Sequence, residues 1–323
     1  MLPRLGLGCM SLSHAYGLPP SEEAGLSMLR AALDEGVRML DTATLYGAGR
    51  NEELVGRAIV GRRDEVLLAS KGGMALVDGV RTIDGRPETL RAQVDASLRR
   101  LGVERIDLYY LHRWDRRVPI GESVGALAEM VARGKIGAIG LSEVSVPRLR
   151  DALQVAPIAA VQNEYSLWSR NPELGMLEET RRRGIALVAF SPVARGFLAD
   201  AVRDPQRWAE NDIRRNLPRF QGENWRANAA ILPAWRALAV EAGCTPAQLA
   251  LAWLLSRGEH VVPIPGTTDI GHLRLNQTAL DLDVDAGILE RAGRLVGTET
   301  VSGPRYGAAQ TAEVDAESFE VAR

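Results

Sequence analysis

The 323-residue sequence predicts an α/β fold, a (β/α)8 TIM barrel that forms one domain over residues 1–323. Three observations support this prediction: the chain is long enough for a barrel, strand-like runs alternate with helix-like segments, and polar residues close the strand-like runs. In such a barrel the carboxyl ends of all strands meet at one mouth, so those polar residues would share one site. An open sheet would instead spread them along an edge.

The predicted strands are short apolar runs that are rich in β-branched residues. There are eight: LGLGCM from Leu5, VRMLDT from Val37, VLLAS from Val66, DLYYLH from Asp107, IGAIGLS from Ile136, IAAVQNE from Ile158, IALVAFS from Ile185 and VVPIPG from Val261. Seven residues stand at or just past the ends of different runs: Asp41, Lys71, His112, Ser142, Gln162, Ser191 and Pro265. We therefore expect these residues at the mouth of the barrel.

Helix signals fill the intervals between the predicted strands. The segment SEEAGLSMLRAALDEG begins with Ser21 as N-cap and ends at Gly36, and PETLRAQVDASLRRLG begins near Pro87 and ends at Gly102. The longest irregular segment, about residues 196–228, follows the seventh strand, and barrel loops of this length are usually functional. We expect a lid or substrate wall there, and a polar C-terminal tail near the active-site mouth.

Composition argues against several kinds of partner. The net charge is −2, so the chain has no basic surplus for nucleic acid or for an anionic membrane surface. No apolar run approaches the roughly 18 residues of a membrane span, and the N-terminus lacks the apolar core of a signal peptide. Cys9 and Cys244 are the only cysteines, so we expect no disulfide framework and a cytoplasmic location.

Three other site chemistries fit the sequence less well. A Rossmann site needs GxGxxG at the start of a helix, whereas LGLGCMSLSHAYG has Gly6 and Gly8 with serine in the third place and no helix signal after it. The four histidines show no paired ligand spacing, so no metal site is predicted. The sequence also lacks the GxSxG nucleophile elbow of many hydrolases.

One set of residues suits proton transfer to a carbonyl group. A free tyrosine titrates near pH 10, so Tyr46 needs a neighbour that stabilises its phenolate. Lys71 could do so while Asp41 holds the ammonium in place, and His112 could donate a hydrogen bond to a substrate oxygen. Only two of the 39 basic residues are lysine, Lys71 and Lys135, which favours a specific need for an ammonium. Each residue alone has an ordinary structural explanation, but together they indicate a site.

These residues stand in segments that resemble the aldo-keto reductases, and most of all the longer-chain bacterial and plant members. The similar segments cover nearly the whole chain and follow the family's order: LDTATLYGAGRNEELVGRAI, ASKGG, DLYYLHRWD, RGKIGAIGLSE, AAVQNEYSLWSR, AFSPVARGFL, LPRFQGEN, TPAQLALAWLL and VPIPGT. The resemblance implies a barrel that binds an extended nicotinamide dinucleotide at its mouth and reduces an aldehyde or ketone. It implies Tyr46 as general acid or base, tuned by Lys71 and Asp41, with His112 orienting the carbonyl.

The resemblance also implies the cofactor-binding residues. Ser142 and Gln162 would hold the nicotinamide carboxamide, and Phe190 would lie against the nicotinamide face. The residues along the pyrophosphate would be Ser191, Pro192, Arg195, Gly196 and Leu198. The adenosine end would lie along IPGTTDIGHLRLN, at Ile264, Pro265, Gly266, Thr267, Thr268, Asp269, His272 and Asn276.

Two positions depart from the family pattern. Relatives usually have basic side chains after PGT that grip the adenosine 2′-phosphate, whereas this chain has Thr268 and Asp269. The carboxylate would repel that phosphate, while His272 and Arg274 offer positive charge nearby, so NADP and NAD both stay open. The family commonly has asparagine where this chain has Glu143, which accepts but cannot donate a hydrogen bond and is a weaker cofactor ligand.

Three functions stay open on the sequence alone. The leading hypothesis is reduction of a small-molecule aldehyde or ketone. The others are a slow or non-turnover subunit that senses nicotinamide redox state, and oxidation of a sugar or secondary alcohol with NAD. Trp114, Trp168, Trp208 and Trp225 fall on segments expected to face the mouth and would suit an apolar or cyclic substrate, although packing is the alternative and is favoured for Trp168.

Overall fold

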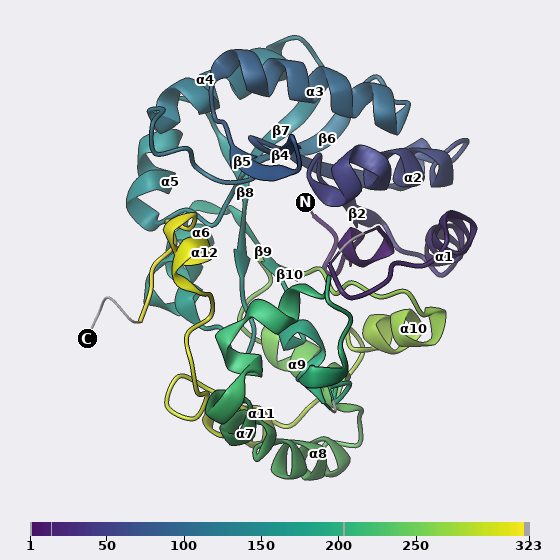
Figure 1. The fold of residues 1–323 in the computed structure, drawn as a ribbon, viewed down its shortest axis with the longest axis vertical. Coiled ribbons are helices and arrows are strands. Elements are labelled where there is room, and N and C mark those ends of the chain that lie inside the picture. Colours follow the sequence, from purple (N-terminus) through teal and green to yellow (C-terminus); the bar gives the residue numbers. More distant parts are fainter. Residues whose placement is uncertain (1, 14, 203, 320–323) are drawn as a thin grey trace.

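The computed structural model describes residues 2–13, 15–202 and 204–319, and within them the chain forms a (β/α)8 barrel (Figure 1). Eight parallel strands neighbour one another in the order β1 (Leu7–Gly8), β2 (Met39–Asp41), β3 (Leu67–Gly72), β6 (Ile106–Leu111), β7 (Ile136–Ser142), β8 (Ile158–Glu164), β9 (Ala186–Phe190) and β10 (Val261–Pro263). Gly6 N donates to Pro263 O at 3.0 Å and Gly8 N donates to Pro265 O at 3.2 Å, which joins the first strand to the last. The predicted TIM barrel is confirmed.

Six of the eight barrel strands lie inside a predicted run, while β3 extends two residues past its run and β6 begins one residue before its run. The runs locate the strands because strands that are buried on both faces are apolar almost throughout. The side chains that point to the barrel axis form one cluster: Met39, Ala69, Leu108, Tyr110, Ala160, Val188, Val262 and Ile264. A second, larger cluster fills the layer between the sheet and the helices. A Cβ on Gly140 would collide with the ring of Tyr110, its partner on β6, so glycine at this position lets β6 and β7 pair.

Helices surround the sheet (Figure 1). They are α1 (Glu22–Asp34), α2 (Arg50–Ala58), α3 (Pro87–Leu101), α4 (Ile120–Ala132), α5 (Val146–Leu153), α6 (Met176–Arg183), α7 (Gly222–Ala229), α8 (Leu232–Glu241), α9 (Pro246–Leu255), α10 (Ile270–Thr278), α11 (Ala286–Leu295) and α12 (Ala308–Ala312). α1 begins as predicted, because Ser21 Oγ accepts from Ala24 N at 3.2 Å. α3 has Pro87 in its first turn and ends at Gly102, whose φ of 65° suits glycine.

A helix that spans a membrane must be both long and apolar. Within the part of the chain that the structure describes, no single helix has both the length and the apolar character that such a span needs. The segments Gly222–Glu241 and Pro246–Leu255 meet the requirement only as a pair, and the pair is bent by 77°.

A two-stranded hairpin that the sequence analysis did not predict follows β3. It consists of β4 (Met74–Val77) and β5 (Val80–Ile83), which pair antiparallel. Asp78 and Gly79 form its turn with φ values of 50° and 79°, the left-handed conformations that an Asp-Gly pair favours. The hairpin reaches the mouth of the barrel, where Met74 and Arg81 line a large cavity.

Two long segments cross the mouth of the barrel. The segment between β9 and α7 contacts the loop after β1, where Ile213 N donates to Ala15 O at 2.9 Å and Asn211 Nδ2 donates to Gly17 O at 3.1 Å. This segment contains short 3-10 turns and ends earlier than predicted, because α7 begins at Gly222. The C-terminal tail, yellow in Figure 1, is hydrogen-bonded to the ends of β7 and β8.

Candidate active site

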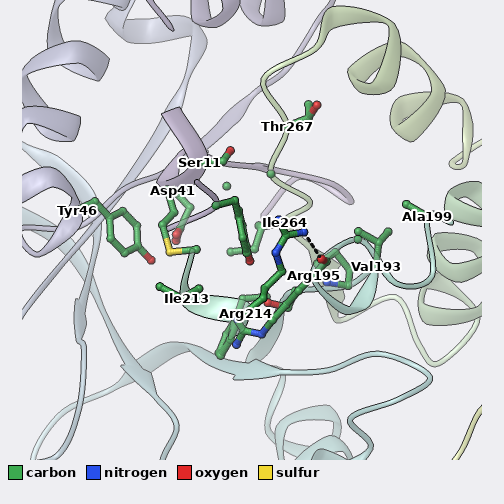
Figure 2. A pocket seen from close by; sticks show the side chains of 18 of the residues that line it. Ser11, Asp41, Tyr46, Val193, Arg195, Ala199, Ile213, Arg214, Ile264 and Thr267 are labelled. Carbon is green, nitrogen blue, oxygen red and sulfur yellow. Dashed lines mark hydrogen bonds between the residues drawn. The ribbon is translucent and has the colours of Figure 1, made fainter. Parts of the chain in front are cut away.

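The carboxyl ends of the barrel strands surround a cavity of about 990 Å³. Figure 2 shows Tyr46 and Asp41 on one side of it and Ala199 on the other. Of the predicted catalytic residues, Asp41, Tyr46 and His112 line the cavity, and Lys71 lies behind them, fully buried. The predicted cofactor residues that line it are Ser142, Gln162, Phe190, Ser191, Pro192, Arg195, Gly196, Ile264, Gly266, Thr267, Thr268, His272 and Asn276.

Lys71 joins Asp41 to Tyr46 inside the barrel. Its Nζ donates to Asp41 Oδ1, to Thr42 O at 2.9 Å and to Tyr46 OH at 3.3 Å. The Lys71 side chain is 1% exposed and the Asp41 side chain 2%, so water is excluded from this pair. Strand register brings the residues together: Asp41 pairs with Ala69 on β3, and Lys71 follows two residues later, just beyond the end of β2.

Gln162 completes the hydrogen bonding of Asp41. From the end of β8, its Nε2 donates to Asp41 Oδ2 at 2.8 Å, while Lys71 occupies Oδ1. Both carboxylate oxygens therefore have a partner, which fixes the plane of the carboxylate. Because Gln162 also lines the cavity, it connects the buried ion pair to the position predicted for the nicotinamide.

Burial sets the protonation state of the tyrosine. Removal from water raises the pKa of Tyr46 above its ordinary value near 10, and the Lys71 ammonium opposes that rise without reversing it. Burial likewise lowers the pKa of Lys71, but Asp41 and Tyr46 raise it by more, so the net pKa of Lys71 is raised. Tyr46 therefore keeps its proton at neutral pH and can give it to a substrate oxygen. Lys71 acts on the pKa of Tyr46 in the predicted direction, and the effect of burial, which the sequence does not show, is larger.

His112 stands beside Tyr46 as a neutral imidazole. The two ring centroids are 6.0 Å apart, with an interplanar angle of 85°. Burial, Arg113 and Lys71 hold the pKa of His112 well below its ordinary value of 6.5. A neutral imidazole donates from one nitrogen and accepts at the other. His112 can therefore donate a hydrogen bond to an oxygen next to Tyr46.

Arg113 is a cavity residue that the sequence analysis missed, although it directly follows His112. Its Nη1 donates to His112 O at 2.6 Å and to Ser142 Oγ at 3.2 Å. Because the Ser142 oxygen accepts from Arg113, its hydroxyl hydrogen is available to donate into the cavity. Ser142 is thus a donor at the place where the resemblance implied a carboxamide contact.

The turn after β9 forms another wall of the cavity. Ser191, Ala194 and Arg195 have positive φ values of 52°, 51° and 56°. The Arg195 Nη2 donates to Glu164 Oε2 at 2.9 Å, and the Arg195 side chain is only 7% exposed. Its charge is therefore neutralised inside the protein, while Arg195 still lines the cavity where the resemblance implies the pyrophosphate. Leu198 is fully buried and is not among the described lining residues.

The predicted adenosine end differs from expectation at Asp269. The Asp269 Oδ1 accepts from His272 N at 2.8 Å and caps α10, and its side chain is 60% exposed. Asp269 and Pro265 are not among the described residues that line the large cavity, whereas His272 is. Arg274 pairs with Glu35 at 2.6 Å and is not in that lining either. The carboxylate therefore serves the helix, which weakens the predicted repulsion of a phosphate.

Buried ion pairs hold the C-terminal tail at the mouth. Arg305 donates to Glu143 Oε1 at 3.1 Å and to Oε2 at 2.5 Å, and Tyr306 OH donates to Glu164 Oε2 at 2.9 Å. The Arg305 side chain is 12% exposed and the Glu143 side chain 0%. Glu143, predicted to be a weak cofactor ligand, therefore binds the tail. Tyr306 also lines the cavity, and nothing in its local sequence marks that role.

The predicted aromatic wall is not formed by tryptophan. None of Trp114, Trp168, Trp208 and Trp225 is among the described lining residues. Trp168 stacks on Phe197 with ring centroids 4.5 Å apart, and Trp208 and Trp225 lie 5.2 and 6.1 Å from Phe220, so these rings pack the loop from behind. The larger apolar side chains of the lining include Met10, Tyr16, Leu18, Leu45, Met74 and Leu217.

Comparison with known proteins agrees with this architecture. A family model, Aldo/keto reductase family, matches residues 4–290. The aldo-keto reductase yakc of Schizosaccharomyces pombe, whose name specifies NADP(+), is 39% identical over 312 residues, which cover 94% of this chain and 92% of that protein.

Solved structures extend the similarity. A glycerol dehydrogenase from Gluconobacter oxydans has a TM-score of 0.84 and 29% identity, with 94% of each chain covered. An aldo/keto reductase from Klebsiella pneumoniae, solved in complex with NADP and acetate, has a TM-score of 0.70 and 28% identity, with 98% of this chain and 95% of that chain covered.

Proposed function

The chain belongs to the aldo/keto reductase family, and we propose that it interconverts aldehydes or ketones and alcohols with NADP(H). The observation that carries this proposal is the contact of the buried Lys71 ammonium with the Tyr46 hydroxyl, at 3.3 Å, in the wall of a large cavity. Structural lysines usually extend to water, because burying a charge is costly. A buried ammonium beside a phenol suits proton transfer at that phenol.

The residues of the cavity fit a nicotinamide dinucleotide. At the reacting end Ser142 presents a hydroxyl hydrogen and Phe190 an aromatic ring, and elsewhere the lining includes Thr268 and His272 at the start of α10. A helix N-terminus favours a phosphate, and a nearby imidazole adds a donor. Because Asp269 caps the helix and is not in the lining, we favour NADP over NAD, in keeping with the name of the S. pombe relative.

The side chains of the site act on the substrate oxygen. When bound, the nicotinamide supplies a hydride to the carbonyl carbon. Tyr46 donates its proton to the carbonyl oxygen, and neutral His112 donates a hydrogen bond that orients it. The Lys71 ammonium stabilises the phenolate that remains, and Asp41 keeps that ammonium charged. In alcohol oxidation the same groups act in reverse, with Tyr46 as the base.

Alcohol oxidation is a second candidate for the physiological direction. The observation that favours it is the similarity to the glycerol dehydrogenase, at a TM-score of 0.84. The same residues act in both directions: Tyr46 donates a proton to the substrate oxygen in reduction and accepts a proton from it in oxidation. The ratio of reduced to oxidised cofactor would then decide the direction.

Steady-state kinetics test the proposed function. The purified protein is assayed with NADPH and with NADH against a panel of aldehydes, ketones and alcohols, by the absorbance of the reduced nicotinamide. We expect many turnovers with NADPH and at least one carbonyl class. Tight dinucleotide binding with no more than one turnover would instead support a redox-sensing subunit, and failure to bind either dinucleotide would contradict the proposal.

A further inference from the structure

Arg113 carries a positive charge at the reacting end of the cavity. It lines the cavity directly after His112, and its Nη1 donates to His112 O and to Ser142 Oγ, neither of which is charged. Its Nε is buried and has no hydrogen-bond partner among the residues that the structure describes. Two hydrogen bonds therefore hold the guanidinium in place, but not all of its N–H groups have a hydrogen-bond acceptor.

The other arginines of the cavity each have a carboxylate partner. They form the pairs Arg81–Glu313 at 2.7 Å, Arg195–Glu164 at 2.9 Å and Arg214–Asp212 at 2.7 Å. No carboxylate of the described part of the chain forms an ion pair with Arg113. Arg113 thus differs from its three counterparts in having its charge uncompensated.

Asp115, two residues along the chain from Arg113, and Asp41, which also lines the cavity, are both paired with other groups. Asp41 is bonded to the Lys71 ammonium, and Asp115 pairs with Arg117 at 2.9 Å. The opposite charges within each of these two pairs cancel, and Tyr46 and His112 are neutral. The guanidinium of Arg113 therefore leaves one unbalanced positive charge at the end of the cavity where the chemistry takes place.

Building on the proposed function, we propose that Arg113 binds a carboxylate of the substrate, and that the preferred substrates are carbonyl compounds with a carboxylate a few bonds from the reacting carbon. The short separation follows from the neighbouring position of His112, which orients the carbonyl oxygen. A planar guanidinium can bind a carboxylate through two charge-assisted hydrogen bonds. A carboxylate also matches one unbalanced charge, whereas a phosphate monoester would bring nearly two.

The carboxylate takes no part in bond making. Hydride from the reduced nicotinamide adds to the carbonyl carbon, the proton of Tyr46 goes to the oxygen, and the carboxylate stays anionic. Arg113 is thus a substrate-binding residue that acts by holding and orienting one class of substrate. In a rival role it would stabilise the negative charge that develops on the carbonyl oxygen, which would help neutral and anionic substrates alike.

Matched acids and amides test the proposal. With NADPH, 2-oxopropanoate is compared with 2-oxopropanamide, and 4-oxobutanoate with 4-oxobutanamide, since each pair is similar in size and differs in charge. We expect kcat/KM of at least one acid to exceed that of its amide by about ten-fold or more. The preference should shrink as salt is added, because salt screens the attraction.

Arg113→Gln removes the charge and keeps a hydrogen-bond donor on a shorter side chain. We expect kcat/KM for the preferred acid to fall by about ten-fold more than kcat/KM for its amide. Arg81→Gln is the matched control: Glu313 already neutralises Arg81, so this variant should keep the preference for the acid. Melting temperatures and NADPH dissociation constants of both variants report whether they fold and hold the dinucleotide.

Two results would overturn this proposal and leave the proposed function standing. In the first, the unaltered protein reduces neutral carbonyls, and its kcat/KM for each amide equals its kcat/KM for the matching acid. In the second, Arg113→Gln loses equal activity on acid and amide, which would assign Arg113 the rival role or the positioning of Ser142. Failure of the proposed function is different, because no carbonyl, charged or neutral, would turn over with either dinucleotide, and both proposals would fall together.

Discussion

Two buried charge clusters at the mouth of one barrel have opposite designs. The lysine cluster consists of Asp41, Tyr46 and Lys71. The tail cluster consists of Glu143, Glu164, Arg195, Arg305 and Tyr306. In each cluster the acidic and basic charges balance, and in each a tyrosine lies against an ionised group. One cluster suits proton transfer and the other holds the C-terminal tail.

The difference lies in what each tyrosine can do with its proton. Among the described residues, the hydrogen-bond partner of Tyr46 OH is the Lys71 ammonium, which accepts nothing, so the acceptor for its proton must come from the cavity. Tyr306 OH already donates to Glu164 Oε2 at 2.9 Å. The Tyr46 proton is therefore available to a substrate in the cavity. The Tyr306 proton is already bound by Glu164, so that tyrosine serves the structure.

Removing the hydroxyl of Tyr46 is the strongest test of this comparison. Tyr46→Phe deletes the proton donor but keeps the ring beside His112, so kcat should fall by about a thousand-fold, within the usual range for general acid–base catalysis. Tyr306→Phe is the matched change in the tail cluster and should lower kcat by less than about ten-fold. Steady-state assays measure both, and comparable losses would remove the distinction between the clusters.

Exchanging the cation should have the next largest effect. Lys71→Arg keeps the positive charge but puts a larger planar group into a site that is 1% exposed, so kcat should fall by about a hundred-fold. Lys135→Arg is the control, because this lysine pairs with Asp95 and its side chain is 33% exposed. The control should change kcat by less than about two-fold. Near-normal turnover of Lys71→Arg would refute the role given to the ammonium.

Breaking the tail cluster should affect stability and substrate binding. Arg305→Met leaves Glu143 buried without its ion partner, which costs about 3–5 kcal/mol, so Tm should fall by several degrees. KM for the carbonyl should rise more than kcat falls, since Tyr306 lines the cavity. Arg291→Met breaks an exposed pair with Glu241 and should lower Tm far less than Arg305→Met does.

A double variant shows whether the tail effect comes from the ion pair. Adding Glu143→Gln to Arg305→Met removes the stranded carboxylate and should restore part of the lost stability. Thermal unfolding of the two single variants and of the double variant gives the coupling between the residues. Strictly additive losses would show that the pair does not hold the tail.

Acid and alkali should affect the two clusters separately. Burial raises the pKa of Glu164, but the positive charges of Arg195 and Arg305 outweigh burial and lower that pKa from 4.5 to about 2. This ionised carboxylate stabilises the fold above about pH 4.5, and the stabilisation is lost as pH falls from 4.5 to about 2. Because the pKa of Tyr46 is raised above 10, reduction should lose its proton donor only above that pH. Melting curves and kcat/KM across pH check both, and a rate inflection near pH 6.5 would implicate His112 instead.

The smallest effect is expected outside both clusters, at the predicted adenosine end. Asp269→Asn removes an exposed charge but keeps a residue that caps α10. The ratio of kcat/KM for NADPH to that for NADH should rise by about three-fold, because an exposed charge is well screened. Asp269→Ala removes the cap as well and separates helix stability from charge. A large loss confined to NADH would show that Asp269 binds the ribose hydroxyl.

The sequence predicted the barrel and the lysine cluster because both depend on local patterns. Parallel strands that are buried on both faces appear as continuous apolar runs, and each barrel strand overlaps a predicted run. Asp41 and Lys71 stand at the ends of such runs, and Tyr46 follows in the adjoining turn. The β4–β5 hairpin also has a local signal, the Asp-Gly pair at Asp78 and Gly79.

Other features of the site had no local signal. Glu143 and Arg305 are 162 positions apart, and no periodicity connects two charges at that separation. Trp208 and Trp225 fall on segments expected to face the mouth, yet both rings pack near Phe220 and neither is among the described lining residues. The net pKa shift of Tyr46 likewise depends on burial by every element around it, whereas the sequence indicated only the ammonium that opposes the shift.

By itself, the sequence determined which residues stand at the strand ends, because hydrophobic periodicity and turn signals run along the chain. Only the tertiary structure decided which charges neutralise one another, that Arg113 has no carboxylate partner among the described residues, and that Tyr46 keeps its proton. The physical reason is that ion pairing and desolvation depend on distances between segments that the fold brings together, and these distances are not written in the order of residues.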